Sequence, residues 1–208
     1  MYKNNLLILF TISLVLLVLG CGPRIMVPPA IDLTAYEPVG IINFACNAEG
    51  KLDRYITQRF IEEMTKDQKL IKIIELGKEE DVLKAVNRVT LGPDVVKEIA
   101  QKYNVKSVIT GELNISGVRP KINIVPGLHG IGAEAEVEAT LVAHMLETID
   151  GATIWTGSSR SKRTVGNVSF WSGGHFSFDA EDPEASYGDL AQELIHNATK
   201  DFRVTWHR

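Results

Sequence analysis

The stretch AEAEVEATLVAHM at residues 133–145 determines the fold, because apolar and polar side chains alternate along it at every position except Val142. Successive side chains of a β-strand point to opposite faces of the sheet, so this pattern predicts a long strand with one buried and one solvated face. The expected buried face holds Ala133, Ala135, Val137, Ala139, Leu141, Ala143 and Met145, and the solvated face holds Glu134, Glu136, Glu138, Thr140 and His144.

The segments on either side extend this strand into an antiparallel meander. Asp150-Gly151 stands between two short apolar runs, and an Asp-Gly pair in that position is a strong signal for a two-residue hairpin turn. Upstream, a period-two pattern begins at Val105 and continues to Val125, and a Gly/Pro loop at residues 126–132 follows it. We therefore expect a meander of three or four strands.

Outside the meander, the chain alternates strand and helix patterns. The apolar runs Val39–Cys46 and Leu70–Leu76 are typical of buried strands. Amphipathic spacing predicts helices over Leu52–Asp67, Glu79–Leu91, Pro93–Asn104 and Tyr187–Phe202. This order predicts an α/β fold at residues 39–208, a single domain with a mixed β-sheet covered by helices.

The first 20 residues differ from the rest, with the apolar run Leu6–Leu19 and a single charge, Lys3. A basic start and a short apolar run match a secretory signal peptide, whereas a membrane-spanning helix needs about 20 apolar residues. The run ends in Val18-Leu19-Gly20-Cys21, which resembles a bacterial lipobox. We predict that residues 1–20 are a lipoprotein signal peptide and that Cys21 is the lipidation site. An uncleaved anchor helix and an ordinary signal peptide are the alternatives.

The residues after Cys21 indicate where the protein is held. Four prolines fall in residues 21–38, which we therefore interpret as a Pro-rich tether between the acylated N-terminus and the domain. Gly22 follows the cysteine, and by resemblance to enterobacterial sorting the absence of Asp there favours the outer membrane. We expect an outer-membrane lipoprotein that carries acyl chains such as palmitate and faces the periplasm.

The charge and cysteine content exclude several classes of protein. The 208 residues contain 22 Lys and Arg against 26 Asp and Glu, a net charge of -4, whereas a general nucleic-acid binder normally has a basic excess. Two cysteines are too few for a disulfide scaffold, and acylation of Cys21 leaves Cys46 with no intrachain partner. Cys46 ends an apolar run, which favours a buried structural cysteine over a reactive thiol.

Catalytic and metal-binding patterns are missing from the sequence. No two of the five histidines have the i, i+4 spacing of helical metal ligands, and no Gly-x-Ser-x-Gly elbow occurs. The glycine-rich loop at residues 127–132 precedes a strand, whereas a phosphate-binding loop precedes a helix. We therefore expect no metal, no cofactor and no enzymatic activity.

Two groups of side chains are candidates for binding a partner. Aromatic residues in a Gly/Ser-rich stretch are unusual for a plain loop, although core packing would also explain them. The basic residues nearby either meet the acidic strand face in a neighbouring strand or bind a lipid head group or a glycan. The candidates are Phe170, Trp171, His175 and Phe176 in the first group and Arg160, Lys162 and Arg163 in the second.

Three segments carry a resemblance to known families: VGIINF at residues 39–44, YNVKSVITGEL at 103–113 and LETIDGATIW at 146–155. Together with the lipobox and the tether, they resemble the curli-assembly lipoprotein family (CsgG-like). The chain is also similar to LpoB-type lipoproteins, which activate peptidoglycan synthases. Both resemblances imply an α/β fold without enzymatic activity.

The two families imply different mechanisms. The LpoB-type resemblance implies a tethered periplasmic domain that binds an envelope or secretion protein. The curli-type resemblance implies a subunit of an oligomeric ring-shaped secretion channel, with hairpins near residues 114–140 and 158–178 inserted into the outer membrane. The alanine-rich strand face and the interruption by Arg119, Pro120 and Lys121 favour the first mechanism.

The lipidation site leads to a direct test. We expect Cys21→Ser, or treatment with the signal-peptidase inhibitor globomycin, to release the protein from the membrane fraction, because the acyl chains supply its membrane affinity. Cell fractionation followed by immunoblotting measures this, with Cys46→Ser as the matched control that stays membrane-bound. Continued membrane attachment of Cys21→Ser would contradict acylation.

Overall fold

The computed structural model describes residues 24–47, 51–123, 132–165, 168–170, 176–178 and 183–207. The chain divides into two compact units, of which the larger is Ala30–Arg203 and the smaller combines the two ends of the chain. The predicted leader and Cys21 lie outside the described residues. Within them, no helix is long and apolar enough to cross a membrane.

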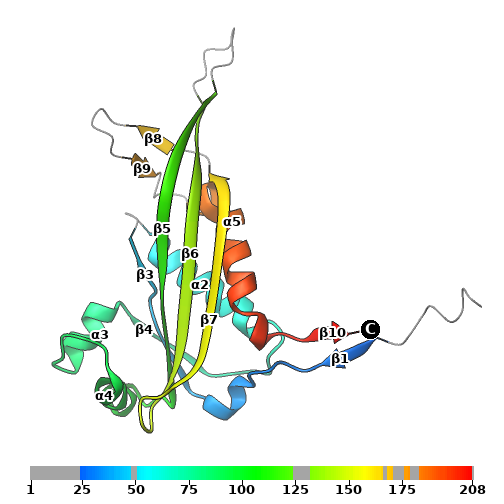
Figure 1. Ribbon diagram of the computed structural model, residues 1–208. Helices are drawn as coiled ribbons and strands as arrows, with labels where there is room; N and C mark the ends of the chain where they lie inside the picture. Colours follow the sequence, from blue (N-terminus) through cyan, green and yellow to red (C-terminus); the bar gives the residue numbers. More distant parts are fainter. Residues whose placement is uncertain are drawn as a thin grey trace, which may run out of the picture. The chain divides into compact units, whose positions relative to one another are not determined.

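The larger unit is built on one mixed sheet (Figure 1). Its strand order is β4-β2-β5-β6-β7, with β3 paired to β5 beyond the end of β2. β2 runs parallel to both β4 and β5, whereas β5, β6 and β7 form an antiparallel meander. The strands are β2 (Val39–Ile42), β3 (Ala45–Cys46), β4 (Ile73–Gly77), β5 (Ser107–Asn123), β6 (Gly132–Glu147) and β7 (Thr153–Val165). The predicted mixed α/β sheet is therefore confirmed.

Helices cover the two faces of the sheet unequally. The neighbours Ile41 and Ile42 of β2 point to opposite faces and enter two separate hydrophobic cores. The larger core contains α2 (Leu52–Thr65) and α5 (Pro183–Ala198), and the smaller contains α3 (Glu79–Ala85) and α4 (Pro93–Tyr103). The smaller core reaches β6 only at the partly buried Leu146, so most of the β6 surface on that side is uncovered.

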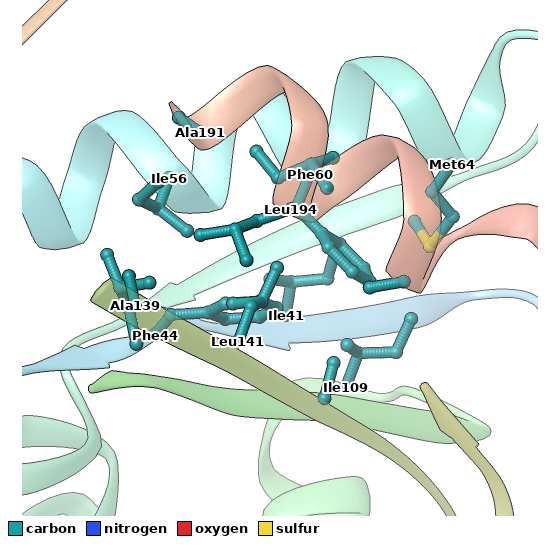
Figure 2. Close-up of a cluster of buried hydrophobic side chains, with 14 of the residues drawn as sticks. Ile41, Phe44, Ile56, Phe60, Met64, Ile109, Ala139, Leu141, Ala191 and Leu194 are labelled. Carbon is teal, nitrogen blue, oxygen red and sulfur yellow. The ribbon is translucent and has the colours of Figure 1, made fainter. Parts of the chain in front are cut away.

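Aromatic side chains form the centre of the larger core (Figure 2). The ring of Phe60 on α2 lies 4.8 Å from that of Phe44 and 6.4 Å from that of Trp155 on β7. Trp155 in turn meets the ring of Phe202 edge-on at 4.5 Å. These distances are typical of stabilising aromatic pairs, so the cluster joins α2, β7 and the segment that follows α5.

The alternation at residues 133–145 is confirmed wherever side chains are described. Val137, Ala139, Leu141, Ala143 and Met145 are all fully buried on the face covered by α2 and α5. Close approach of α5 also requires a glycine on β7, because a Cβ on Gly157 would lie 2.5 Å from the Ala198 carbonyl oxygen. The small side chains of the meander thus allow α5 to pack close to the sheet.

The hairpins differ in how well the sequence predicted them. The hairpin expected at Asp150-Gly151 joins β6 to β7, but the connection is longer than a two-residue turn and spans residues 148–152. Gly151 has a φ of 78°, which favours glycine. β5 continues through Pro120 to Asn123, although the proline was expected to interrupt it. The register shifts between Ser116 and Arg119, and such a bulge accommodates a residue that has no N–H to donate.

Helix α3 is shorter than predicted. It ends at Ala85, whereas the amphipathic pattern continues to Leu91. Asn87 adopts a left-handed conformation with a φ of 56°, which turns the chain out of the helix and leaves Val89 90% exposed. The amphipathic pattern therefore placed the end of this helix six residues too late.

The compact unit starts earlier than the boundary that we predicted at residue 39. Leu33 lies in the short 3-10 helix η1 (Leu33–Tyr36) and is fully buried in the larger core. The Gln68 side chain accepts the Leu33 N–H at 3.1 Å and donates to the carbonyls of Ile31 and Phe202 at 2.9 and 2.7 Å. Residues 30–38 are thus packed into the domain and do not serve as a tether.

This packing predicts a difference between two leucines. We expect Leu33→Ala to lower the free energy of unfolding by about 2–5 kcal/mol, because it opens a cavity in the core. Leu70→Ala is the matched control, since Leu70 is 100% exposed and its loss costs about 0.5 kcal/mol or less. Urea denaturation followed by circular dichroism measures both. If the free energy of unfolding of Leu33→Ala equals that of the parent, residues 30–38 are not packed into the domain and belong to the tether.

Candidate functional site

The predicted aromatic group is only partly described. Phe170 and Phe176 are paired opposite each other in a short hairpin of β8 (Val168–Phe170) and β9 (Phe176–Phe178). Trp171 and His175 lie outside the described residues. The backbone of β8 lies beside β6.

The three basic candidates do not form one patch. Arg160 pairs with Glu138, and Lys162 pairs with Glu136 at 2.6 Å, so both lie over the acidic face of β6 as one of the two alternatives predicted. Arg163 has the opposite parity on β7 and reaches across to Glu193 of α5 at 2.6 Å. Hydrogen bonds from Arg163 and Ser161 lower the pKa of Glu193. Grouping Arg163 with the other two was therefore wrong.

The uncovered face of β6 is a solvated ladder of paired charges. His144 faces Thr156 across the strands with Nδ1 3.0 Å from the hydroxyl oxygen. Among the described residues, no three His, Cys, Asp or Glu side chains come together as a metal site would require. Pairing across neighbouring strands explains these residues without a ligand.

Cys46 is half-buried and not fully buried as expected. It lines a groove of about 750 Å³ at the carboxyl ends of β2 and β3, together with charged residues of α2 and α3. Two of these charges are already paired, Lys78 with Asp53 at 3.7 Å and Arg88 with Glu98 at 2.5 Å. Burial, followed by the nearby Cys46, raises the pKa of the Tyr187 hydroxyl beyond its ordinary range.

A second hollow, which we call the α2–α5 groove, lies on the helix layer. Its volume is about 430 Å³. Side chains of α2, the end of β7 and α5 form its walls. The lining residues are Tyr55, Arg59, Glu62, Glu63, Thr164, Val165, Glu184, Gly188, Asp189, Leu190, Gln192 and Ile195.

Arg59 is held in place at one wall of this groove. It lies 3.0 Å from a carboxylate oxygen of Glu62, one turn along α2, and 2.5 Å from one of Glu184 on α5. Its guanidinium carbon lies 5.5 Å from the centre of the Tyr55 ring. Hydrogen bonds with Tyr55 and Glu62 raise the pKa of Arg59 further. Arg59 therefore serves as a fixed cross-link between the two helices.

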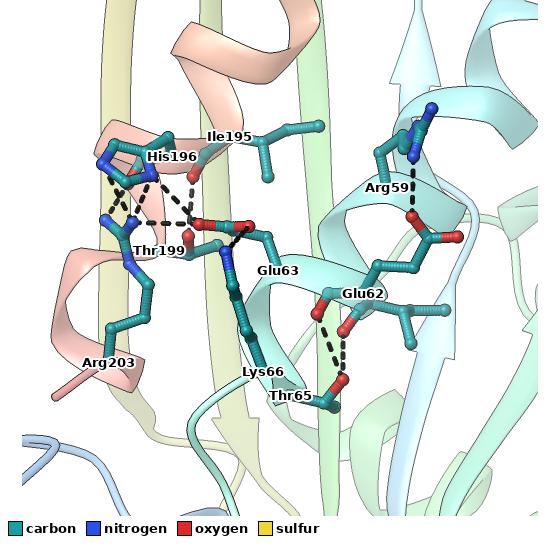
Figure 3. Close-up of polar contacts among 10 residues, drawn as sticks. Arg59, Glu62, Glu63, Thr65, Lys66, Ile195, His196, Thr199 and Arg203 are labelled. Atoms are coloured by element: carbon teal, nitrogen blue, oxygen red, sulfur yellow. Dashed lines mark hydrogen bonds and ion pairs between the residues drawn. The ribbon is translucent and has the colours of Figure 1, made fainter.

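A second polar cluster, Glu63, His196 and Arg203, fixes the other end of the helix pair (Figure 3). Glu63 Oε1 lies 2.9 Å from Arg203 Nη1 and 3.0 Å from His196 Nδ1. Arg203 also donates to the carbonyl of His196. The side chains of Arg203 and Glu63 are only 13% and 21% exposed, so this pair is shielded from solvent more than the other ion pairs of the helix layer.

The α2–α5 groove carries an excess of negative charge. Its lining contains Glu62, Glu63, Glu184 and Asp189 but only one basic residue, Arg59, and Glu63 is paired with Arg203 outside the lining. Asp189 is exposed and makes no ion pair or hydrogen bond with any described residue. A groove of this kind is suited to a cationic group. The sequence holds only a weak signal for it, because polar residues on the outer side of a helix are usually solvated without further role.

The sequence and the structure of the chain were compared with known proteins. No protein-family model and no curated protein matches it. Solved structures with a similar arrangement include the PelC dodecamer from Paraburkholderia phytofirmans, with 14% identity, a TM-score of 0.42, and coverage of 88% of this chain and 97% of that chain.

Two further solved structures are shorter matches. The LpoB C-terminal domain from Salmonella enterica has 9% identity and a TM-score of 0.36, covering 62% of this chain and 84% of that chain. Lipoprotein GNA1162 from Neisseria meningitidis has 11% identity and a TM-score of 0.34, covering 61% and 82%. Similarities of this degree do not establish a shared activity or assembly.

The shielded cluster predicts a contrast between two adjacent glutamates. We expect Glu63→Gln to lower the free energy of unfolding by about 1–3 kcal/mol, because it leaves the shielded Arg203 without its anion. Glu62→Gln is the control, with an expected loss of about 0.5 kcal/mol or less for an exposed pair. Urea denaturation at neutral pH measures both. Equal losses would show that the Glu63 cluster is no more important than a surface ion pair.

Proposed function

We propose that the protein is a non-enzymatic lipoprotein of the outer membrane whose periplasmic α/β domain binds a protein partner. Acylation at Cys21, predicted from the lipobox, supplies the anchor. The α2–α5 groove supplies the binding surface, and the partner acts in secretion or envelope assembly. No cofactor takes part.

The observation that carries this proposal is the exposed carboxylate of Asp189 in an acidic groove, which has no ion-pair partner among the described residues. A lysine or arginine of a partner that enters the groove meets Asp189 and the rim carboxylates Glu62 and Glu184. Because Arg59 is already held by Tyr55, Glu62 and Glu184, the walls need little rearrangement on binding. A basic segment of a partner protein is the occupant that this charge distribution favours.

The predicted aromatic segment connects the walls of the same groove. β7 ends at Val165 and α5 begins at Pro183, and both elements line the groove. The intervening chain contains Phe170 and Phe176 on the β8–β9 hairpin. The β7 and α5 walls of the groove and the aromatic segment thus belong to one stretch of chain, and we propose that they contact the same partner.

Site-specific photo-crosslinking tests this proposal in cells. A photoreactive amino acid replaces the exposed, groove-lining Gln192 in the otherwise natural chain and in an E184K/D189K variant. We expect a covalent adduct with an envelope protein in the first case and about tenfold less adduct in the second, because two attractive charges become repulsive.

Asp94→Lys is the matched control for charge reversal. Asp94 lies on α4 with its side chain 91% exposed, and it does not line the groove. This variant should form the adduct normally, and all variants should stay membrane-bound and melt at similar temperatures. Undiminished adduct from E184K/D189K would contradict the groove as the binding surface.

The long β5–β6 pair supports a second candidate function, a subunit of a secretion channel. β5 and β6 stay paired up to Asn123 and Gly132, so the first of the two segments expected to insert is a long hairpin at its described ends. The second segment, residues 158–178, divides between β7 and the separate β8–β9 pair. A channel subunit would form rings after detergent extraction and conduct ions in planar bilayers, whereas a monomer without conductance would contradict it.

A further inference from the structure

The smaller unit contains an apolar two-stranded ribbon. β1 (Ile25–Val27) pairs antiparallel with β10 (Thr205–His207), and Met26 stands directly opposite Trp206. Side chains opposite each other in a ladder share a face, so Met26 and Trp206 form one apolar pair on one side of the ribbon. Ile25 and Val27 point to the other side.

These apolar side chains are exposed and close together. Ile25 is 64% exposed, Met26 56%, Val27 37% and Trp206 62%. Single exposed hydrophobic residues are normal on a protein surface, but this six-residue ribbon carries four of them, and Met26 and Trp206 lie together on one side. The other large apolar residues exposed in the described chain, Leu70, Val89 and Ile149, lie in three separate segments.

The covalent chain places this ribbon near the membrane if Cys21 is acylated. Only residues 22–24 separate Cys21 from Ile25. An extended chain advances at most about 3.6 Å per residue, so the Cα of Ile25 lies within roughly 15 Å of that of Cys21. The ribbon therefore stays close to the residue that carries the acyl chains, and this limit holds for any orientation of the α/β domain.

We propose that the β1–β10 ribbon contacts the phospholipid surface in which Cys21 is anchored. This inference rests on the lipid anchor of the proposed function. Trp206 and Met26 lie at the boundary between headgroups and acyl chains, a position that tryptophan favours because its ring is apolar and its N–H is polar. The exposed Arg24 next to the ribbon faces the lipid phosphates.

The size of the ribbon supports this assignment. An isolated two-stranded ribbon is marginally stable in water, and this one has only three residue pairs. Contact with lipid stabilises it, because a backbone group without a hydrogen bond costs more free energy where water is scarce. The interface thus favours the paired form, and the paired form presents Met26 and Trp206 together.

Fluorescence quenching by brominated lipid tests the contact without relying on cellular acylation. The mature chain from Cys21 onward, with Cys46→Ala, is coupled through the Cys21 thiol to a maleimide lipid in phosphatidylethanolamine and phosphatidylglycerol vesicles. A second set of vesicles contains brominated phosphatidylcholine, which quenches tryptophan at the headgroup boundary. The chain has three tryptophans, so variants that remove one ring each identify the quenched residue.

We expect brominated lipid to reduce the emission of the parent chain, and W206F to abolish most of that reduction. W171F is the matched control, and its emission should still be reduced by brominated lipid. M26S should show a smaller reduction, because a polar side chain weakens the contact of the ribbon with lipid. Equal quenching of the parent and W206F would overturn the proposal, as would quenching that only W171F removes. Because coupling replaces acylation here, failure of this test leaves the anchor intact, and release of Cys21→Ser tests the anchor separately.

Discussion

The packing of Phe60 against the sheet is the contact on which the rest of the domain depends. Phe60 is fully buried between Phe44, at the end of the parallel half of the sheet, and Trp155, on the last strand of the meander. Through Trp155 the same cluster includes Phe202, which follows α5 in the sequence. Because these rings come from distant parts of the chain, neither the parallel half nor the meander buries its apolar face alone.

One-sided packing also explains where the polar chemistry gathers. With α2 and α5 both on one face of the meander, their outer edges meet side by side, and carboxylates and arginines at that edge form the groove and its two cross-links. Among the described residues, no helix of the smaller core packs on the opposite face of β6 beyond Leu146, and Glu136 and Glu138 there pair with cations of β7. In the groove, Asp189 has no ion-pair partner within the described part of the chain, whereas on the opposite face of β6 the described glutamates are paired.

The two ends of the chain meet in a separate element. β1 comes from the N-terminal side and β10 from the last residues, so the ribbon forms only when both ends are brought together. The segment that follows the predicted anchor is therefore shorter than a tether of 18 residues.

The sequence by itself determined the periodicity and the turns. Alternation at residues 133–145 identified the buried face of β6, and Asp150-Gly151 identified the hairpin. The position of Arg160 and Lys162 over the acidic strand face was one of two alternatives that the sequence left open, and the ion pairs decided it. The parity of residues along β7 separates Arg163 from these two, so its position on the helix side could have been deduced. These features are local, because each depends on the spacing of neighbouring residues along one strand.

Only the tertiary structure decided what depends on distant segments. The burial of Leu33 requires Gln68 and Phe202, the passage of β5 through Pro120 requires a bulge against β6, and the end of α3 requires a left-handed Asn87. The α2–α5 groove and the β1–β10 ribbon each join residues that lie more than a hundred positions apart. No local pattern encodes such pairs, since their contact is set by packing and by strand register.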